Sequence, residues 1–240
     1  MNLLDAEVLL VVALVALYLQ DSALLLHFDE VLVEGDGRGW RVSSGTGLEL
    51  RGRFLSIPNP LLPMRTRFRA SWLHASVVAP ETPDGIAGYA RMLWPVRLGC
   101  TLTGVVLLGV MPWLLLGARD PLQLLVALAA AWLLIITMLA YLAVRRATLQ
   151  MSRRQLAGLA AEALLCPPHA INLYRQLCAM RGFRGDPIAF AASQLPDHER
   201  QRLRASIDAR LDLFALAHHA ASNRGPALAS ARTRIAGLLR

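Results

Sequence analysis

The chain has 240 residues, of which 55% are hydrophobic and 18% are charged. Ordinary soluble domains are about 45–50% apolar and about 25% charged, so this composition argues against a typical soluble protein and indicates membrane segments. The net charge is +8, and all 25 basic residues are arginines. The three cysteines, Cys100, Cys166 and Cys178, are too few and too scattered for the disulfide framework of a small secreted domain.

Three apolar runs stand out along the chain, at residues 3–19, 98–118 and 122–144. A helix needs about 20 apolar residues to cross a bilayer core of about 30 Å. The second and third runs meet this length, and neither contains a charged residue. The first run, assigned to residues 1–20, is shorter and has Asp5 and Glu7 in its opening turn. We expect it either to span the membrane, with residues 24–26 as a candidate extension, or to lie at the interface.

The second and third runs are predicted to form an antiparallel helical hairpin over residues 98–144. The sequence Arg119-Asp120-Pro121 between them is typical of a tight turn. Pro112 is expected to kink the first helix of the hairpin, because proline removes a backbone hydrogen bond. Ala127 and Ala131 are four residues apart in the second helix and would allow a neighbouring helix to approach closely.

Arginines predict the orientation of this hairpin. Four of them follow the third run within ten residues, at Arg145, Arg146, Arg153 and Arg154. The turn contains only Arg119, and arginine-rich flanks remain on the cytoplasmic side of a membrane. We therefore expect the turn to face outward and residues 21–97 and 145–240 to lie in the cytoplasm. The N-terminus is expected outside if the first run spans.

Residues 21–97 have the pattern of a small antiparallel β-meander. Short, partly alternating runs are separated by glycine-rich turns at residues 35–39 and 45–47. A phosphate loop needs a strand before the glycines and a helix after them, whereas residues 35–39 have strand-like sequence on both sides, so we interpret them as a hairpin turn. Residues 64–72 alternate again, with arginines on one side, and form either a last strand or a basic segment on the membrane surface.

Residues 145–240 are predicted to form a cytoplasmic helical domain. Prolines and glycines predict its helix breaks, at Pro167-Pro168, Gly182, Asp186-Pro187, Pro196-Asp197 and Gly225-Pro226. Its first helix, residues 148–165, is a candidate continuation of the third membrane span. Asp186 is a candidate N-cap. In the long helix after residue 197, apolar positions recur on one face, at Leu203, Ile207, Leu211, Phe214 and His218.

The stretch CPPHAINLYRQLC, residues 166–178, contains two cysteines and one histidine. Pro168 fits the first turn of a helix, whose rise would separate the two cysteines by about 15 Å or more. A disulfide needs Cα atoms within about 7 Å, so the two cysteines share neither a disulfide nor a metal ion. Cys178 belongs to the buried face of the helix. Cys166 and His169 remain candidate catalytic residues, because a helix N-terminus stabilises a thiolate.

Other histidine and carboxylate patterns do not predict a metal ion or a cofactor. The chain has no HExxH sequence, and the adjacent His218 and His219 point to different parts of a helix surface. Asp208 and Asp212 lie four residues apart, as in a cation site or an acid–base pair, but the arginines around them favour a solvated charged face. The second run holds no ionisable side chain besides Cys100 and the third holds no charged residue, which argues against a self-sufficient ion-coupled transporter.

The positive charge is concentrated in residues 145–240, which hold fifteen arginines and six acidic residues, about +9 in total. Residues 21–97 hold nine arginines and eight acidic residues, about +1. We expect the basic region to contact the anionic cytoplasmic leaflet, where each basic group contributes about 1 kcal/mol. Nucleic-acid binding is not expected, because the region has no recognisable binding module.

The sequence thus predicts a mainly α integral membrane protein with three transmembrane helices, a small cytoplasmic antiparallel β-element and a C-terminal cytoplasmic helical domain. The predicted segments are residues 1–20, 21–97, 98–144 and 145–240. Because the clear features serve anchoring and helix packing, the expected function is a non-catalytic scaffold, assembly or regulatory subunit of the bacterial inner membrane, with a protein partner or as a homo-oligomer. The alternatives are a membrane-face enzyme using Cys166 or His169 and a subunit of a multi-component transporter or secretion system.

Overall fold

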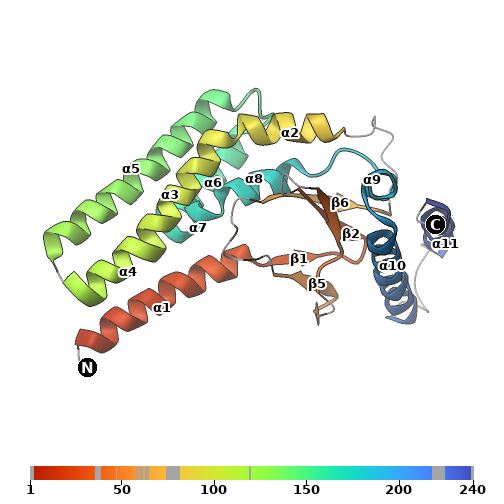
Figure 1. Cartoon of the computed structure of the whole chain (residues 1–240), viewed down its shortest axis with the longest axis horizontal. Helices are drawn as coiled ribbons and strands as arrows, with labels where there is room; N and C mark the ends of the chain where they lie inside the picture. The colour runs from red at the N-terminus through yellow and green to blue at the C-terminus, as the bar shows by residue number, and fades with distance from the viewer. Residues whose placement is uncertain are drawn as a thin grey trace. The chain divides into compact units, whose positions relative to one another are not determined.

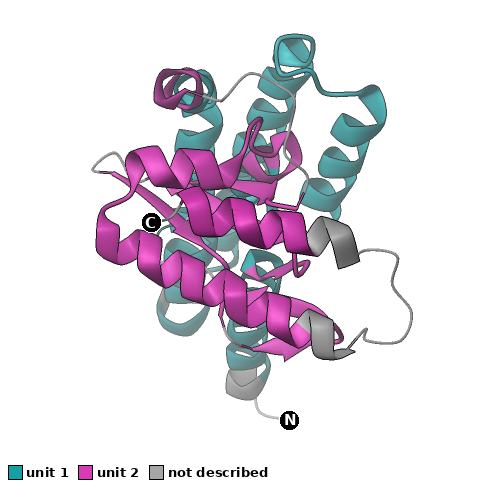
Figure 2. Cartoon of the chain, turned by 90° about the vertical axis from the view of Figure 1, so that its right-hand side faces the viewer, with its two compact units in different colours: residues 1–22, 59–64, 89–176 teal, residues 23–58, 65–88, 177–240 magenta. Residues whose placement is uncertain are grey.

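The computed structural model describes residues 3–35, 39–46, 48–57, 59, 62, 65–73, 82–118, 120–217 and 225–238. Within these ranges the chain is mainly helical with short antiparallel strands. This confirms the predicted mainly α class and the predicted antiparallel β-element. The chain separates into two compact units (Figure 2). Unit 1 consists of residues 1–22, 59–64 and 89–176, and unit 2 of residues 23–58, 65–88 and 177–240. Each unit therefore combines three separate stretches, whereas the prediction divided the chain into consecutive segments.

Unit 1 is helical in its described residues (Figure 1). Its helices are α1 (Leu3–Ser22), α3 (Trp94–Val105), α4 (Met111–Trp113), α5 (Pro121–Arg145), α6 (Arg153–Leu165) and α7 (Pro167–Ile171). The π-helical turns η1 (Val106–Val110) and η2 (Leu114–Ala118) flank α4 and make the stretch from α3 onward continuous. Two further helices, α2 (Pro83–Met92) and α8 (Leu173–Arg181), contribute residues to both units.

Among the residues that the structure describes, two helical stretches are long and apolar enough to cross a membrane, Trp94–Gly117 with 24 residues and Pro121–Arg145 with 25. They correspond to the second and third predicted spans. Only 28% of the most apolar part of each is buried inside the chain, whereas the core helix of a soluble protein is mostly buried. Large side chains such as Leu102, Trp113 and Leu133 are exposed along them. Length, composition and exposure therefore support membrane association, and the span predicted for α1 remains a prediction.

Pro112 lies in α4, with a π-helical turn on each side. Proline has no backbone N–H to donate, and its ring clashes with the carbonyl four residues earlier. A π-helical turn widens the helix locally, because its hydrogen bonds join residues five apart. The predicted disturbance at Pro112 therefore takes the form of π-helical turns around it.

Close packing of α3 against α5 is centred on Gly99 and Met138. A Cβ atom at position 99 would lie 2.5 Å from both Cγ and Sδ of Met138, so a larger residue fits only if Met138 moves. The Cys100 thiol lies 3.9 Å from the same sulfur. Ala127 and Ala131 are buried in α5, as expected of small residues that let helices approach closely.

The end of α1 corrects one sequence-based expectation. The helix stops at Ser22, and Leu24–Leu26 form a strand in unit 2 instead of extending the apolar helix. Leu26 is fully buried there and packs with Leu32 and Phe54, so burial in the sheet core prevails over helix continuation. Within unit 1, α1 packs against η1, η2 and α7. Its first turns lie toward the same end of the unit as the turn between α4 and α5 (Figure 1).

The helices after α5 differ from the prediction at two boundaries. α5 ends at Arg145 and α6 begins only at Arg153, so α6 does not continue the apolar span directly. A capping box fixes this start, because Ser152 Oγ accepts from the Gln155 backbone N–H and Gln155 Oε1 accepts from the Ser152 N–H. The helix predicted to run through to about residue 181 is interrupted at Asn172, whose φ of −94° and ψ of 0° are not helical.

Unit 2 contains two three-stranded antiparallel sheets, with strand orders β1-β5-β4 and β3-β2-β6 (Figure 1). The strands are β1 (Leu24–Leu26), β2 (Glu30–Gly35), β3 (Trp40–Ser43), β4 (Glu49–Leu50), β5 (Arg53–Ser56) and β6 (Thr66–Ser71). The pairing of β6 with β2 replaces the sequential order of the predicted meander. It also decides between the alternatives for residues 64–72 in favour of a strand.

β2 and β3 pair from Gly35 opposite Trp40, which confirms an antiparallel hairpin at the glycine cluster. Residues 36–38 of this cluster lie outside the described residues. A Cβ atom on Gly35 would lie 2.8 Å from the Trp40 ring, so the close cross-strand contact requires glycine. Gly35 therefore serves strand pairing.

Three helices complete unit 2, α9 (Pro187–Gln194), α10 (Asp197–Ala217) and α11 (Gly225–Leu238). The predicted N-cap of α9 is confirmed, because Asp186 Oδ1 accepts from the Ile188 N–H at 2.8 Å. Leu203, Ile207 and Leu211 of α10 are buried on one face, as their spacing predicted. The side chains of residues 214 and 218, predicted on this face, are outside the described set.

Candidate functional site

The predicted reactive residues, Cys166 and His169, lie at the start of α7. Cys166 is the N-cap residue, is half-buried and makes no side-chain capping hydrogen bond. His169 is also half-buried, and its buried Nδ1 has no hydrogen-bond partner in the described part of the chain. α7 has only five residues, so few peptide dipoles are aligned to stabilise a thiolate. A reactive role for these residues stays a prediction.

The other two thiols are buried. Cys178 lies in α8 and is fully inaccessible, the environment expected for the inner face of a helix. Cys100 lies beside Met138 in the α3–α5 contact. Both thiols are inaccessible, and a buried free cysteine behaves as a small hydrophobic residue.

A buried polar cluster at the turn between α7 and α8 was not recognised from the sequence. Arg175 is only 7% exposed. Its Nη1 donates to Asn172 Oδ1 at 3.1 Å and to Ser22 Oγ at 3.3 Å. Its Nη2 donates to the carbonyls of Asn59 and Leu62, both at 2.9 Å. Asn172 Nδ2 in turn donates to Ser22 Oγ at 3.1 Å.

These hydrogen bonds join three parts of unit 1, the end of α1, residues 59 and 62, and the α7–α8 turn. The four acceptors are neutral oxygens, and a buried oxygen that loses its donor destabilises the fold. We therefore interpret Arg175 as a structural clamp. The sequence does not predict this role, because an arginine inside a helical stretch is usually solvated. The only local indication of the buried cluster is Asn172, which interrupts the helix.

The predicted charged face of α10 carries ion pairs. Arg232 Nη2 lies 3.0 Å from Asp212 Oδ1, and Arg204 Nε lies 3.8 Å from Asp208 Oδ2. Both carboxylates are thus engaged by arginines, as the charged-face interpretation expects. Among the described residues, histidines, cysteines and carboxylates form no group of three that could hold a metal ion. His218 and His219 lie outside these residues.

The four arginines predicted to face the membrane surface all belong to unit 1. Arg145 is the last residue of α5 and is exposed, and Arg146 is half-buried in the turn that follows. Arg153 and Arg154 are exposed in the first turn of α6. A helix N-terminus carries a partial positive charge, so two cations there are unfavourable unless an anion lies nearby. Their contact with lipid stays a prediction.

Buried charges in unit 2 are matched by partners from its own strands. Arg67 Nη2 lies 2.6 Å from Glu34 Oε1, and both side chains are mostly inaccessible. Burial lowers the pKa of Arg67, and the Glu34 carboxylate offsets part of this effect. Burial likewise lowers the pKa of Arg210 to about 10, with Glu30 and Asp29 opposing it. Arg210 therefore remains a cation at neutral pH, and we interpret both arginines as structural.

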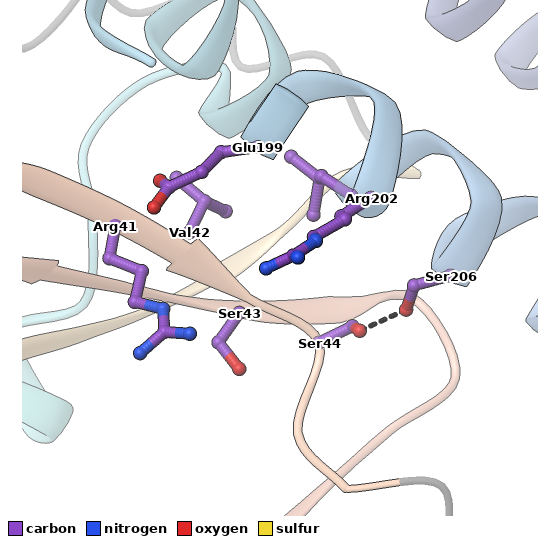
Figure 3. Close-up of a pocket in the computed structure, with 8 residues that line it drawn as sticks. Arg41, Val42, Ser43, Ser44, Glu199, Arg202 and Ser206 are labelled. Carbon is purple, nitrogen blue, oxygen red and sulfur yellow. Dashed lines mark hydrogen bonds between the residues drawn. The ribbon is translucent and has the colours of Figure 1, made fainter. Parts of the chain in front are cut away.

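A pocket of about 150 Å³ lies between β3 and α10 of unit 2 (Figure 3). Its polar lining comprises two arginines, three serines and one carboxylate, at Arg41, Ser43, Ser44, Glu199, Arg202 and Ser206. The side chain of Arg202 extends from α10 toward β3, and the hydroxyls of Ser44 and Ser206 are hydrogen-bonded to each other (Figure 3). The pocket thus combines cationic and hydroxyl donors, which are suited to bind an anion.

No local pattern in the sequence predicts this pocket. Its residues come from a strand and a helix more than 150 positions apart in the sequence, so no local spacing connects them. Comparison of the chain with protein-family models, curated proteins and solved structures gives no match. A function for this protein is therefore assigned from the residues and the geometry of the chain itself.

Proposed function

We propose that the protein is an integral protein of the bacterial cytoplasmic membrane that acts as a non-catalytic scaffold, assembly or regulatory subunit. The observation that carries this proposal is the apolar hairpin formed by Trp94–Gly117 and Pro121–Arg145. Most of its surface is exposed in the chain alone, and large apolar side chains without a covering layer require lipid or a partner.

The proposed topology places the α4–α5 turn outside and the β-sheets in the cytoplasm. The arginines after α5 support this orientation, because basic flanks remain cytoplasmic. α1 is proposed as a third span. Its 20 residues and its packing against η1 and η2 support this, and its first turns point to the same end as the α4–α5 turn (Figure 1).

Anionic lipid is the proposed neighbour of the arginine pair that opens α6. Arg153 and Arg154 are exposed at a helix end that disfavours cations, and lipid phosphates would neutralise them. Each arginine near an anionic surface contributes about 1 kcal/mol. The basic segment would thereby fix the depth of unit 1 in the membrane.

The scaffold role is proposed because the charged groups buried in unit 2 bind its own backbone and strands. Arg67 pairs with Glu34, and Arg210 Nη1 donates to the Glu30 carbonyl at 2.8 Å. These interactions rigidify a small domain attached to membrane helices, an arrangement suited to holding a partner at the membrane. The partner is proposed to be another membrane protein or a second copy of the chain.

Chemical cross-linking in native membranes, followed by purification of the tagged full chain in mild detergent, tests the role. We expect the chain to purify as a defined homo-oligomer or together with a stoichiometric partner, and the cross-linked species to match that assembly in mass. An unrelated membrane protein with the same tag serves as the control. Recovery of a monomer alone, with no cross-linked species in the membrane, would contradict the scaffold proposal.

A further inference from the structure

We propose that the pocket between β3 and α10 binds a phosphate group, carried either by a soluble phosphate compound or by a lipid headgroup. The pocket lies wholly within unit 2, so this inference is independent of the scaffold function proposed above. Three features of the pocket support the proposal: the donors that line it, the two arginines without an acidic partner, and its size.

β3 supplies donors from one side. Arg41 and Ser43 are two residues apart in the strand, so their side chains lie on the same face of the sheet. Ser43 Oγ accepts a hydrogen bond from the Gly45 N–H at 3.2 Å, which leaves the hydroxyl proton available to donate. Ser44 follows the strand and is buried.

α10 supplies donors from the other side. Arg202 and Ser206 are four residues apart and lie one above the other on one helix face. The hydrogen bond between Ser206 and Ser44 uses one of their two hydroxyl protons, so the second can donate to a ligand. It also links the helix to the residue that follows β3, so these two hydroxyls are positioned before a ligand arrives.

The arginines of the pocket have no carboxylate committed to them. In the described part of the chain, the side chain of neither Arg41 nor Arg202 forms an ion pair or a hydrogen bond. Glu34 lies opposite Arg41 in the β2–β3 register, but it is engaged by Arg67 at 2.6 Å. Both residues are exposed, so water solvates them in the absence of a ligand, and two guanidinium groups that line one pocket attract an anion.

Glu199 is the one carboxylate among the described residues of the lining, and its charge opposes an anion. It lies at the Arg41 end of the pocket, away from the Ser44–Ser206 hydrogen bond (Figure 3). The lining therefore carries two positive charges and one negative charge. This balance favours a single anionic group and makes the charge of Glu199 a test of the proposal.

A phosphate group fits these donors better than a carboxylate does. It presents several acceptor oxygens in different directions, so it can accept from both arginines and from serine hydroxyls together. The pocket volume of about 150 Å³ exceeds the ~10–15 Å³ needed for one water, so there is room for a polyatomic anion. Arginine is also the cation whose planar fork matches phosphate geometry.

Isothermal titration calorimetry of inorganic phosphate into the detergent-purified full chain tests the site. We expect saturable binding that weakens about tenfold, or about 1.4 kcal/mol, in Arg202→Gln and in Arg41→Gln. Glu199→Gln should bind phosphate more tightly than the unaltered chain does, because it removes the opposing charge. Arg53→Gln removes an exposed β5 arginine that does not line the pocket and should leave the affinity unchanged.

A second arm distinguishes the two sources of the phosphate group. The chain is reconstituted into phosphatidylcholine vesicles with or without phosphatidic acid, and the phosphate titration is repeated. Loss of the phosphate response in the presence of phosphatidic acid would assign the site to a lipid headgroup. An unchanged response would assign it to a soluble phosphate compound.

Two results would overturn the proposal. One is the absence of saturable phosphate binding to the unaltered chain in detergent and in phosphatidylcholine vesicles. The other is equal affinity of Arg202→Gln and Arg53→Gln, which would show that phosphate binds through general surface charge. Tighter phosphate binding by Glu199→Gln cannot result from a folding defect. This variant therefore tests the charge of the pocket without that ambiguity.

Discussion

Arg175 and Arg210 show how single buried cations stabilise this chain. Arg175 donates to carbonyl and side-chain oxygens of unit 1, and Arg210 donates to the Glu30 carbonyl and lies 4.0 Å from the centre of the Phe54 ring. Backbone carbonyls at turns have no partner within their own element. One guanidinium has five donors and can satisfy several of these oxygens together.

Replacement of Arg175 by methionine should destabilise unit 1 strongly. The carbonyls of Asn59 and Leu62 would stay buried without donors, and we expect the free energy of unfolding to fall by about 3 kcal/mol. Thermal unfolding in detergent, followed by reaction of buried Cys100 with a thiol-specific dye, measures the change. Arg154→Met is the matched control, because Arg154 is exposed in the same unit. Equal midpoints for the two variants would contradict the clamp.

Residue-scale roles were only partly predictable. The N-cap Asp186 and the buried Cys178 follow from local rules on capping and helix periodicity. The clamp by Arg175 depends on residues 22, 59 and 62, which are far away in the sequence. Helix periodicity does not reveal such partners, because it concerns positions three or four residues apart.

At the scale of elements, the close contact between α3 and α5 depends on Gly99, which has no side chain. Gly99→Leu should force Met138 out of its position and lower the stability of the hairpin by about 1–3 kcal/mol, as overpacking does. Met138→Ala in the same chain should restore part of the loss by making room. The dye-based unfolding measurement applies here too.

Gly109→Leu is the control for this prediction. Gly109 lies in η1, and a Cβ atom there meets no other atom within 4 Å. The change should therefore alter stability by no more than about 0.5 kcal/mol. If Gly99→Leu were equally mild, or if Met138→Ala failed to compensate, the close helix contact would not be a determinant of stability.

Element boundaries show where sequence patterns succeed and fail. Alternating apolar and polar residues, together with a glycine-rich turn, predicted the strands β2 and β3. Both patterns are local, because they involve residues that are close together in the sequence. Leu24–Leu26 read as apolar helix, since a run of three leucines has no period and only burial against Phe54 makes it a strand. The start of α6 was readable in principle, because Ser152 and Gln155 have capping-box spacing.

For the whole molecule, the apolar hairpin was predictable and the two compact units were not. Hydrophobicity summed over about 20 residues is a local property, so the predicted runs 98–118 and 122–144 located the apolar helices 94–117 and 121–145 to within a few residues. The units combine segments such as residues 59–64 and 177–240 with distant ones. Such combinations depend on long-range contacts, which leave no periodic signal in the chain.

The proposed function depends on a hairpin that crosses the membrane with its turn on the outer side. Asp120 caps α5 at this turn, and Ser193 is exposed on α9 in unit 2. Single cysteines at these two positions, in a chain whose native cysteines are replaced by alanine, can be labelled in intact cells with a membrane-impermeant maleimide. We predict that Asp120→Cys reacts from outside and that Ser193→Cys reacts only after the membrane is opened. Labelling of Ser193→Cys from outside, with Asp120→Cys protected until lysis, would contradict the topology.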